Sequence, residues 1–223
     1  MKCAITGVAA GLAAAVAVAQ STDFVRQPPA WQVALAASKA TAAGEAIATK
    51  GKGAAVACAG CHGAKGIPPP DAPFPRLAGL PIEYMAKQLF DYRDGSRPNP
   101  IMNPIAKALT DADIASLAWH YASLPVPGNR TSPVGWSNRA GQLARYGDNA
   151  LALKACSDCH GNDQTGGGPI LPPLAQPAAY IAAQLRAFRA NERRNDADNV
   201  MRELSKRLSD ADIDALADYY AGR

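Results

Sequence analysis

Two short cysteine–histidine segments carry the residues of this sequence that are best suited to chemistry. Residues 58–62 read CAGCH, and residues 156–160, 98 positions later, read CSDCH. The pattern Cys-x-x-Cys-His is typical of covalent haem attachment. On a helical turn, residues three and four apart share one face, so both thiols can form thioethers to haem vinyl groups while the histidine points at the iron. The sequence therefore predicts two haem c groups, attached at Cys58, Cys61, Cys156 and Cys159, with His62 and His160 as axial iron ligands.

Zinc and disulfide chemistry are the alternatives for the same cysteines. Two Cys-x-x-Cys pairs can form a four-thiolate zinc site, but such pairs usually lie about 15–20 residues apart. A redox dithiol is expected in a thioredoxin-like strand–helix setting, and no strand pattern precedes either segment. Because each pair also carries its own histidine, haem is favoured over zinc and over disulfides.

The first residues resemble a secretory signal peptide. Lys2 provides the positive start, residues 4–19 form an alanine-rich run, and Ala17–Ala19 fits the small-x-small cleavage pattern. The run is short for a bilayer span, so we expect no stable membrane span after cleavage before Gln20; an uncleaved anchor is the alternative. Cleavage would remove Cys3 and leave every remaining cysteine in the haem segments. Export agrees with haem attachment outside the bacterial cytoplasm, and we predict a periplasmic protein.

Composition is compatible with two small domains that each enclose a cofactor. The chain has 223 residues, enough for two domains of about 100 residues. Aromatic residues make up only 6%, which is thin for two cores made of protein alone, and haem would add apolar surface. The formal charge of +4 falls when Lys2 is removed and would be offset by haem propionates. We therefore expect neither nucleic acid nor anionic membrane as a partner.

An internal repeat extends beyond the haem segments. Residues 75–78, 84–89 and 109–114 match residues 172–175, 180–185 and 208–213, and Arg93, Arg97, Met102 and Tyr121 match Arg189, Arg193, Met201 and Tyr220. A period of this length indicates a duplicated domain rather than a solenoid. We divide the chain into a signal peptide (1–19), an N-terminal extension (20–43), a first domain (44–124), a proline-rich linker (125–135) and a second domain (136–223). The linker is short, so the two domains should pack together.

Each repeat is predicted to be helix and loop, which makes the fold all-α. Helical spacing or start signals occur at residues 38–50, 84–93, 110–123, 137–146, 180–190 and 209–222. Thr110-x-x-Asp113 and Ser209-x-x-Asp212 have the hydroxyl and acid of a helix N-terminus. No alternating strand pattern is present.

The second axial ligand can be found by elimination. The histidines are His62, His120 and His160, so a second histidine cannot serve both irons. Met102 and Met201 follow their histidines by 40 and 41 residues, in polar segments that we expect to be irregular. They are the predicted sixth ligands, with an ordinary surface or core position as the alternative. Met/His ligation raises a haem potential. Met85 is expected in the core, because Ile181 stands at its repeat position, and His120 at the surface or between domains.

These motifs together resemble class I c-type cytochromes of the di-haem cytochrome c4 type, over residues 44–222. The resemblance implies two tandem class I cytochrome c domains, each wrapping one covalently attached haem. It implies that Gly44 and Gly141 lie at a crossing of the first and last helices, under Tyr121 and Tyr220, although an ordinary helix-end glycine is the alternative. It also implies that the carbonyls of Pro75 and Pro172 accept the proton of the proximal histidine.

Two further points concern residues beside these motifs. Arg93, Arg97, Arg189 and Arg193 could pair with haem propionates, or could lie on solvated helix faces. Residues 20–43 have no counterpart and could be a flexible arm or a partner-docking segment.

Function follows from the ligand inventory. We predict a periplasmic electron carrier, not an enzyme, that passes single electrons from a dehydrogenase or quinol-oxidising complex to a terminal oxidase or reductase, either freely or as a fixed dehydrogenase subunit. The alternative is a haem enzyme, a di-haem peroxidase or a sulfur-compound dehydrogenase, which would need an open iron or an unusual ligand. A redox or gas sensor would usually carry an added signalling domain, and none is found in the sequence.

Overall fold

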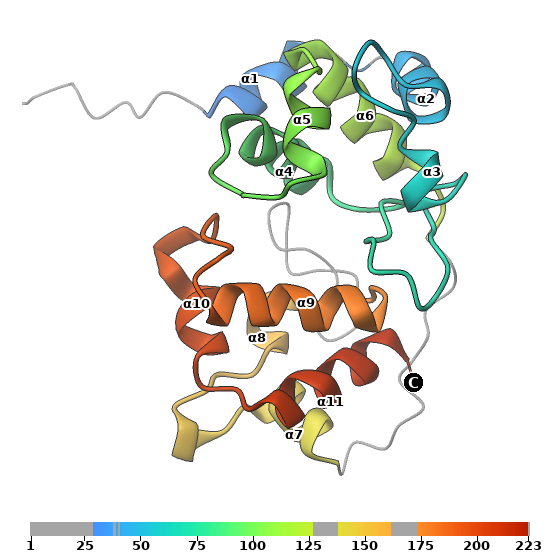
Figure 1. Cartoon of the computed structure of the whole chain (residues 1–223). Helices are drawn as coiled ribbons and strands as arrows, with labels where there is room; N and C mark the ends of the chain where they lie inside the picture. The colour runs from blue at the N-terminus through green and yellow to red at the C-terminus, as the bar shows by residue number, and fades with distance from the viewer. Residues whose placement is uncertain (1–28, 38, 40, 127–137, 162–173, 223) are drawn as a thin grey trace, which may run out of the picture.

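The computed structural model describes residues 29–37, 39, 41–126, 138–161 and 174–222. The predicted signal peptide, most of the predicted linker and Pro172 lie outside these residues. The described chain forms two helical halves, residues 29–126 and 138–222, which are stacked in Figure 1. Two isolated β-bridges occur in the described ranges, with no strand, as the sequence predicted.

Both halves follow one order of helices. The first contains α1 (Ala30–Ala37), α2 (Thr41–Lys50), α3 (Ala59–His62), α4 (Ile82–Asp94), α5 (Met102–Lys107) and α6 (Asp111–Ser123). The second contains α7 (Arg139–Tyr146), α8 (Ser157–His160), α9 (Ala178–Arg189), α10 (Val200–Ser205) and α11 (Asp210–Ala221), with 3-10 turns at Asn149–Leu151 and Ala197–Asn199. From α2 to α6 and from α7 to α11, the elements correspond one to one, apart from the 3-10 turns. The predicted helices are confirmed with boundary shifts of a few residues.

Helices α2 and α6 of the first half cross at a glycine. A β-carbon placed on Gly44 would lie 2.1 Å from the Ser116 carbonyl oxygen and 2.8 Å from the β-carbon of His120. Only a residue without a side chain lets the two backbones approach this closely. The expected crossing is therefore present, and the atoms nearest to Gly44 belong to Ser116 and His120. Gly141 is buried in α7, which packs against α11.

Capping boxes begin the last helix of each half. The Thr110 and Ser209 hydroxyls accept hydrogen bonds from the backbone N–H groups of Asp113 and Asp212, whose carboxylates accept from the capping residues in return. Each carboxylate also pairs with a cation from the start of its half, Lys52 at 2.7 Å for the first and Arg139 at 3.0 Å for the second. In each half, this ion pair links the first turn of the last helix to a residue earlier in the same half.

Part of the N-terminal extension is a helix rather than a free arm. Helix α1 packs against α4 and α6, and its Ala34 and Leu35 join the core of the first half. No matching helix precedes α7 within the described residues. Met85 is 5% exposed in the same core, as predicted. Within the described ranges, no helix combines the length and apolarity needed to cross a membrane.

Candidate haem sites

Both cysteine–histidine segments have the same backbone. Cys58 and Cys156 have φ and ψ angles of −61°, −32° and −61°, −35°, and each is followed by one helical turn. The N–H groups of His62 and His160 donate to the carbonyls of these cysteines at 2.9 and 3.0 Å. The duplicated sequence therefore forms a duplicated local structure, with thiols and imidazole on consecutive positions of one turn.

A glycine that our sequence reasoning missed ends each turn. Gly63 and Gly161 have φ angles of +81° and +79°, a region that side chains disfavour. A β-carbon on Gly63 would also lie 2.1 Å from the carbonyl oxygen of Ile67. The signal was available, because a glycine directly follows the histidine in both copies. At both positions, glycine lets the chain turn away directly after the histidine.

The two thiols of each pair have different surroundings. Cys58 and Cys156 are half-buried, whereas Cys61 and Cys159 are exposed. Burial raises the pKa of the Cys58 and Cys156 thiols, which the Tyr121 and Tyr220 hydroxyls contact by hydrogen bonds. These tyrosines of α6 and α11 thus reach the first cysteine of their own half. Within the described residues, no disulfide joins these four cysteines.

The zinc alternative finds no support in this arrangement. Over the described ranges, no three His, Cys, Asp or Glu side chains gather as a metal cluster. The cysteine pairs stand on α3 and α8, in separate halves. A four-thiolate centre would need all four sulfurs around one ion.

His62 is held in the tautomer that a metal ligand needs. Its ring is buried, with 7% exposed, and Nδ1 lies 2.9 Å from the Pro75 carbonyl oxygen. Burial lowers the pKa of His62, against the hydrogen bond to Pro75. The neutral ring therefore donates from Nδ1 and leaves Nε2 free for iron. The predicted role of Pro75 is confirmed; His160 is also buried, while its expected partner Pro172 lies outside the described residues.

The two methionines begin short helices rather than irregular segments. Met102 is the first residue of α5 and packs, with Cys58, against the apolar core of the first half. Met201 is the second residue of α10. The expectation of irregular structure was wrong because side chains close a turn there. In the first half, the Asn99 carboxamide oxygen accepts from the Ile101 and Met102 N–H groups at 3.0 and 2.8 Å.

The four arginines named above as possible propionate partners fall into two classes. Arg93 and Arg189 reach forward to the last helix of their half, where they bind the aspartates Asp111 and Asp210. They also donate to the backbone carbonyls of Leu109 and Leu208. Their charges are matched by these aspartates, so a role with propionates is not needed to explain them.

Arg97 and Arg193 are buried between the halves, with 5% and 9% exposed. Arg97 donates across the boundary to the Tyr180 hydroxyl at 3.0 Å and the Gln184 carboxamide oxygen at 2.8 Å. Arg193 donates back to Tyr84 at 3.4 Å and Gln88 at 3.2 Å, in a nearly symmetric pattern. The predicted packing of the two halves is therefore confirmed. Helices α4 and α9 face each other there in Figure 1.

This arginine pair fits a cofactor with carboxylates. Among the described residues, every hydrogen-bond partner of the two guanidinium groups is uncharged. Buried charges are normally paired, and a cavity of about 310 Å³ lined by both arginines lies beside them. Burial acts to raise the pKa of Tyr180, but the charges of Arg97 and Arg193 lower it. Both cations, together with the carboxylate of Glu192, line this cavity, and their pairing with haem propionates stays a prediction.

A second contact across the boundary joins Arg76 to residues 175 and 176. The backbone N–H of Arg76 donates to the Gln176 carboxamide oxygen at 2.7 Å, and the Gln176 amide donates to the Arg76 carbonyl at 3.2 Å. The Arg76 side chain donates to the Ala175 carbonyl as well. These bonds hold the halves together at a second place, apart from the arginine pair.

His120 does not lie at the boundary. It is partly buried on α6 beside α2, and its ring packs edge-on against Tyr121 with centroids 5.0 Å apart. Burial lowers its pKa, and Glu45 opposes that shift. Of the two predicted positions, at the surface or between the domains, the structure excludes the second, because α6 turns this partly exposed residue toward α2 of its own half.

Comparisons with known proteins agree with the duplicated site. The cytochrome c family model matches residues 42–124 and again 146–221. The "Thiosulfate dehydrogenase electron acceptor" of Stutzerimonas stutzeri (strain A1501) is 40% identical over 80% of this chain and 85% of that protein.

Two solved structures resemble this one. The reduced recombinant cytochrome c4 from Pseudomonas stutzeri has a TM-score of 0.71 and 32% identity, and covers 82% of this chain and 97% of that one. The thiosulfate dehydrogenase TsdBA from Marichromatium purpuratum, in its as-isolated form, has a TM-score of 0.72 and 37% identity over 81% of this chain. The present chain spans only 40% of that longer protein. With the family model matched twice and both Cys-x-x-Cys-His segments in place, this chain belongs to the cytochrome c family and carries two covalently bound haem c groups.

Proposed function

We propose that this protein is a periplasmic di-haem electron carrier that takes electrons from a dehydrogenase acting on thiosulfate and delivers them to a terminal oxidase or reductase. Cys58 and Cys61 hold the first haem and Cys156 and Cys159 the second. The axial ligands are His62 with Met102 and His160 with Met201. When bound, each haem supplies one-electron redox chemistry.

The observation that carries this proposal is the joined pair of sites. Each half has its own cysteine pair and its own buried histidine, and buried hydrogen bonds fix the halves to each other. Two one-electron sites at a fixed separation suit a protein that stores and relays electrons. The signal-like residues 1–19 support export.

The donor is inferred from the relatives. The Stutzerimonas stutzeri protein is named as an electron acceptor of thiosulfate dehydrogenase, and the TsdBA structure is named as a thiosulfate dehydrogenase with a region of similar fold. This chain matches the acceptor over most of both lengths. The acceptor role therefore transfers more directly than the catalytic role.

A reconstituted reaction tests the assignment. The purified protein with both haems is mixed anaerobically with thiosulfate and a catalytic thiosulfate dehydrogenase, and reduction is followed by haem absorbance. Both haems should be reduced when enzyme and substrate are present, and neither when the enzyme is omitted. Dithionite reduction serves as the control for intact haems.

Two results would overturn the proposal in different ways. Reduction by thiosulfate alone, with continuing turnover, would show that the chain is itself a sulfur-compound dehydrogenase. No reduction in the complete mixture, in a protein that dithionite reduces fully, would remove thiosulfate dehydrogenase as the donor.

A further inference from the structure

Asn195 joins the second half to the first through three hydrogen bonds beyond those of the arginine pair. Its side-chain amide donates to the Asp91 carboxylate at 2.6 Å and to the Gln88 carboxamide oxygen at 2.9 Å. Its backbone carbonyl accepts from the Lys87 ammonium group at 3.1 Å. Lys87 and Asp91 form an ion pair with each other on α4, and their side chains are only 28% and 13% exposed. A residue of the second half is thus held by a charged pair of the first half.

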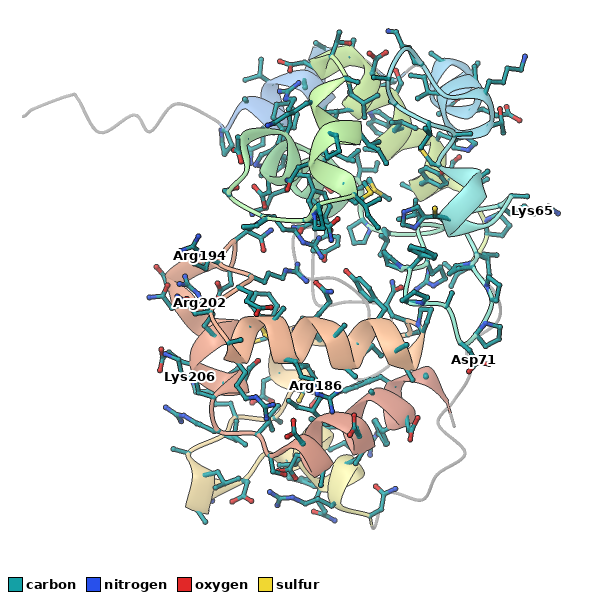
Figure 2. The ribbon with its side chains drawn as sticks, viewed as in Figure 1. Lys65, Asp71, Arg186, Arg194, Arg202 and Lys206 are labelled. Atoms are coloured by element: carbon teal, nitrogen blue, oxygen red, sulfur yellow. The ribbon has the colours of Figure 1, made fainter. Side chains whose placement is uncertain are left out.

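The segment that begins at Asn195 leads directly to Met201. The carboxylate of Asp196, with 5% of its side chain exposed, accepts from the backbone N–H and the Nε–H of Arg202 at 3.0 and 2.8 Å. Arg202 directly follows Met201 in the chain. Figure 2 shows Arg194 and Arg202 together at the edge of the second half, with Arg194 toward the first half. The place of the Met201 backbone therefore depends on residues that lie next to Asn195.

The first half holds its own methionine segment from within. Asn99 stands at the repeat position of Asn195, and its carboxamide oxygen accepts from the Met102 N–H at 2.8 Å. Asn103, which directly follows Met102, donates to the Tyr92 carbonyl at 2.5 Å. Over the part of the chain that the structure describes, no hydrogen bond joins Asn99 to the second half. The first methionine segment therefore does not rely on the other half as the second one does.

Two alanines account for this difference between the halves. Ala183 and Ala187 of α9 stand at the repeat positions of Lys87 and Asp91, and their methyl groups cannot form hydrogen bonds. Together with Asn99, they line the cavity of about 310 Å³ at the boundary. On one side of the boundary a lysine–aspartate pair fills the space beside the opposite segment, whereas on the other side a cavity remains.

We propose that Lys87 and Asp91 are positioning residues of the first half that keep Met201 on the iron of the second haem. This inference rests on the proposed ligation of that iron by Met201. A methionine ligand raises the potential of its haem, so a variant or a partner that separates the halves would lower the potential of the second haem first. Met102 would stay in place, because its segment is held within its own half.

Imidazole binding to the ferric, haem-loaded protein tests this inference. Imidazole binds only where a methionine has left the iron, so its apparent affinity follows the fraction of open sites. Asp91→Ala should raise the affinity of the second haem about tenfold, because the loss of a hydrogen bond to a charged group corresponds to roughly that factor. The potential of the second haem should fall, and the first haem should not change. NMR signals of the Met102 and Met201 methyl groups, assigned with the Met→Ala variants, report on the two haems separately.

Two matched variants separate this role from a general loss of stability. Asn195→Ala removes the other end of the same contact and should have the same effect on the second haem. The double variant should add little to either single change, since both remove one interaction. Asp94→Ala removes a carboxylate from the exposed end of the same helix, where it accepts from the Ser96 N–H, and should change neither haem.

The outcomes distinguish this inference from the ligand assignment. If wild-type protein shows the ferric methionine–iron band at both haems and Asp91→Ala changes neither haem, or both equally, the positioning role is refuted while the ligation stands. A change confined to the first haem would refute it as well. If the second haem of the wild type lacks the band, the ligation by Met201 fails, and the role of Lys87 and Asp91 fails with it.

Discussion

Replacing Gln88 by leucine should loosen the two halves of the molecule. Gln88 is buried, with 7% exposed, and its carboxamide oxygen accepts three hydrogen bonds. These come from Arg97 at 2.6 Å, Arg193 at 3.2 Å and the Asn195 amide at 2.9 Å. Leucine has a similar size but cannot accept any of them, so three donors around the boundary would lose a partner.

The expected size of the effect follows from these bonds. A hydrogen bond to a charged group contributes about 1.5–3 kcal/mol and a neutral one about 1 kcal/mol. Because Arg97 keeps Tyr180 and Gln184 as partners, the losses will not add fully. We therefore expect Gln88→Leu to lower the free energy of unfolding by about 3 kcal/mol.

Gln184→Leu is the matched control. Gln184 occupies the same repeat position, but its oxygen accepts two bonds, from Arg97 and Arg193, both at 2.8 Å. It is also only half-buried, so water can replace part of the loss. This variant should be destabilised by less, about 1–2 kcal/mol.

Denaturant unfolding of the haem-loaded proteins provides the assay, with one haem band recorded for each half. Wild type should unfold in one transition, whereas Gln88→Leu should unfold at lower denaturant and show the two halves separating. Equal stability of Gln88→Leu and wild type would refute the reasoning that these bonds hold the boundary. Equal losses in the two variants would refute the ranking.

Two further predictions concern the iron ligands and acid stability. Met102→Ala and Met201→Ala should each open one iron, lower the potential of that haem and permit carbon monoxide binding there; retention of the full ferric methionine–iron band in either variant would contradict the ligand assignment. Burial acts to raise the pKa of Asp113 in the folded protein, but hydrogen bonds from Lys52 and Thr110 lower it below its ordinary value. Its contribution to stability should be present above the ordinary aspartate pKa of about 3.9 and be lost as pH falls through the lower folded value. Asp113→Asn should therefore be less stable than wild type at pH 6 and less sensitive to acid in urea titrations between pH 6 and pH 3; unchanged acid sensitivity would contradict this.

Local chemistry and local structure could be predicted from the sequence because they depend on residues close together in the chain. A turn that contains two cysteines and a histidine needs only its own five residues and the glycine after them. The capping hydroxyls of Thr110 and Ser209 act on N–H groups three residues away. The repeat then doubled each of these predictions, and it also placed Met85 in the core.

The long-range contacts depended on the tertiary structure. Arg93 and Arg97 are four residues apart in one sequence motif, yet the first binds an aspartate of its own half and the second reaches tyrosine and glutamine in the other half. Their local sequences do not distinguish them, because the partners lie 18 and more than 80 residues away. The same holds for Gly44 and for helix α1, whose places depend on which helix packs over them. The sequence by itself determined which residues attach the haems and led to the proposal of which residues ligate the iron. The tertiary structure decided which charges were left unmatched between the halves, because only packing brings distant residues within hydrogen-bond distance.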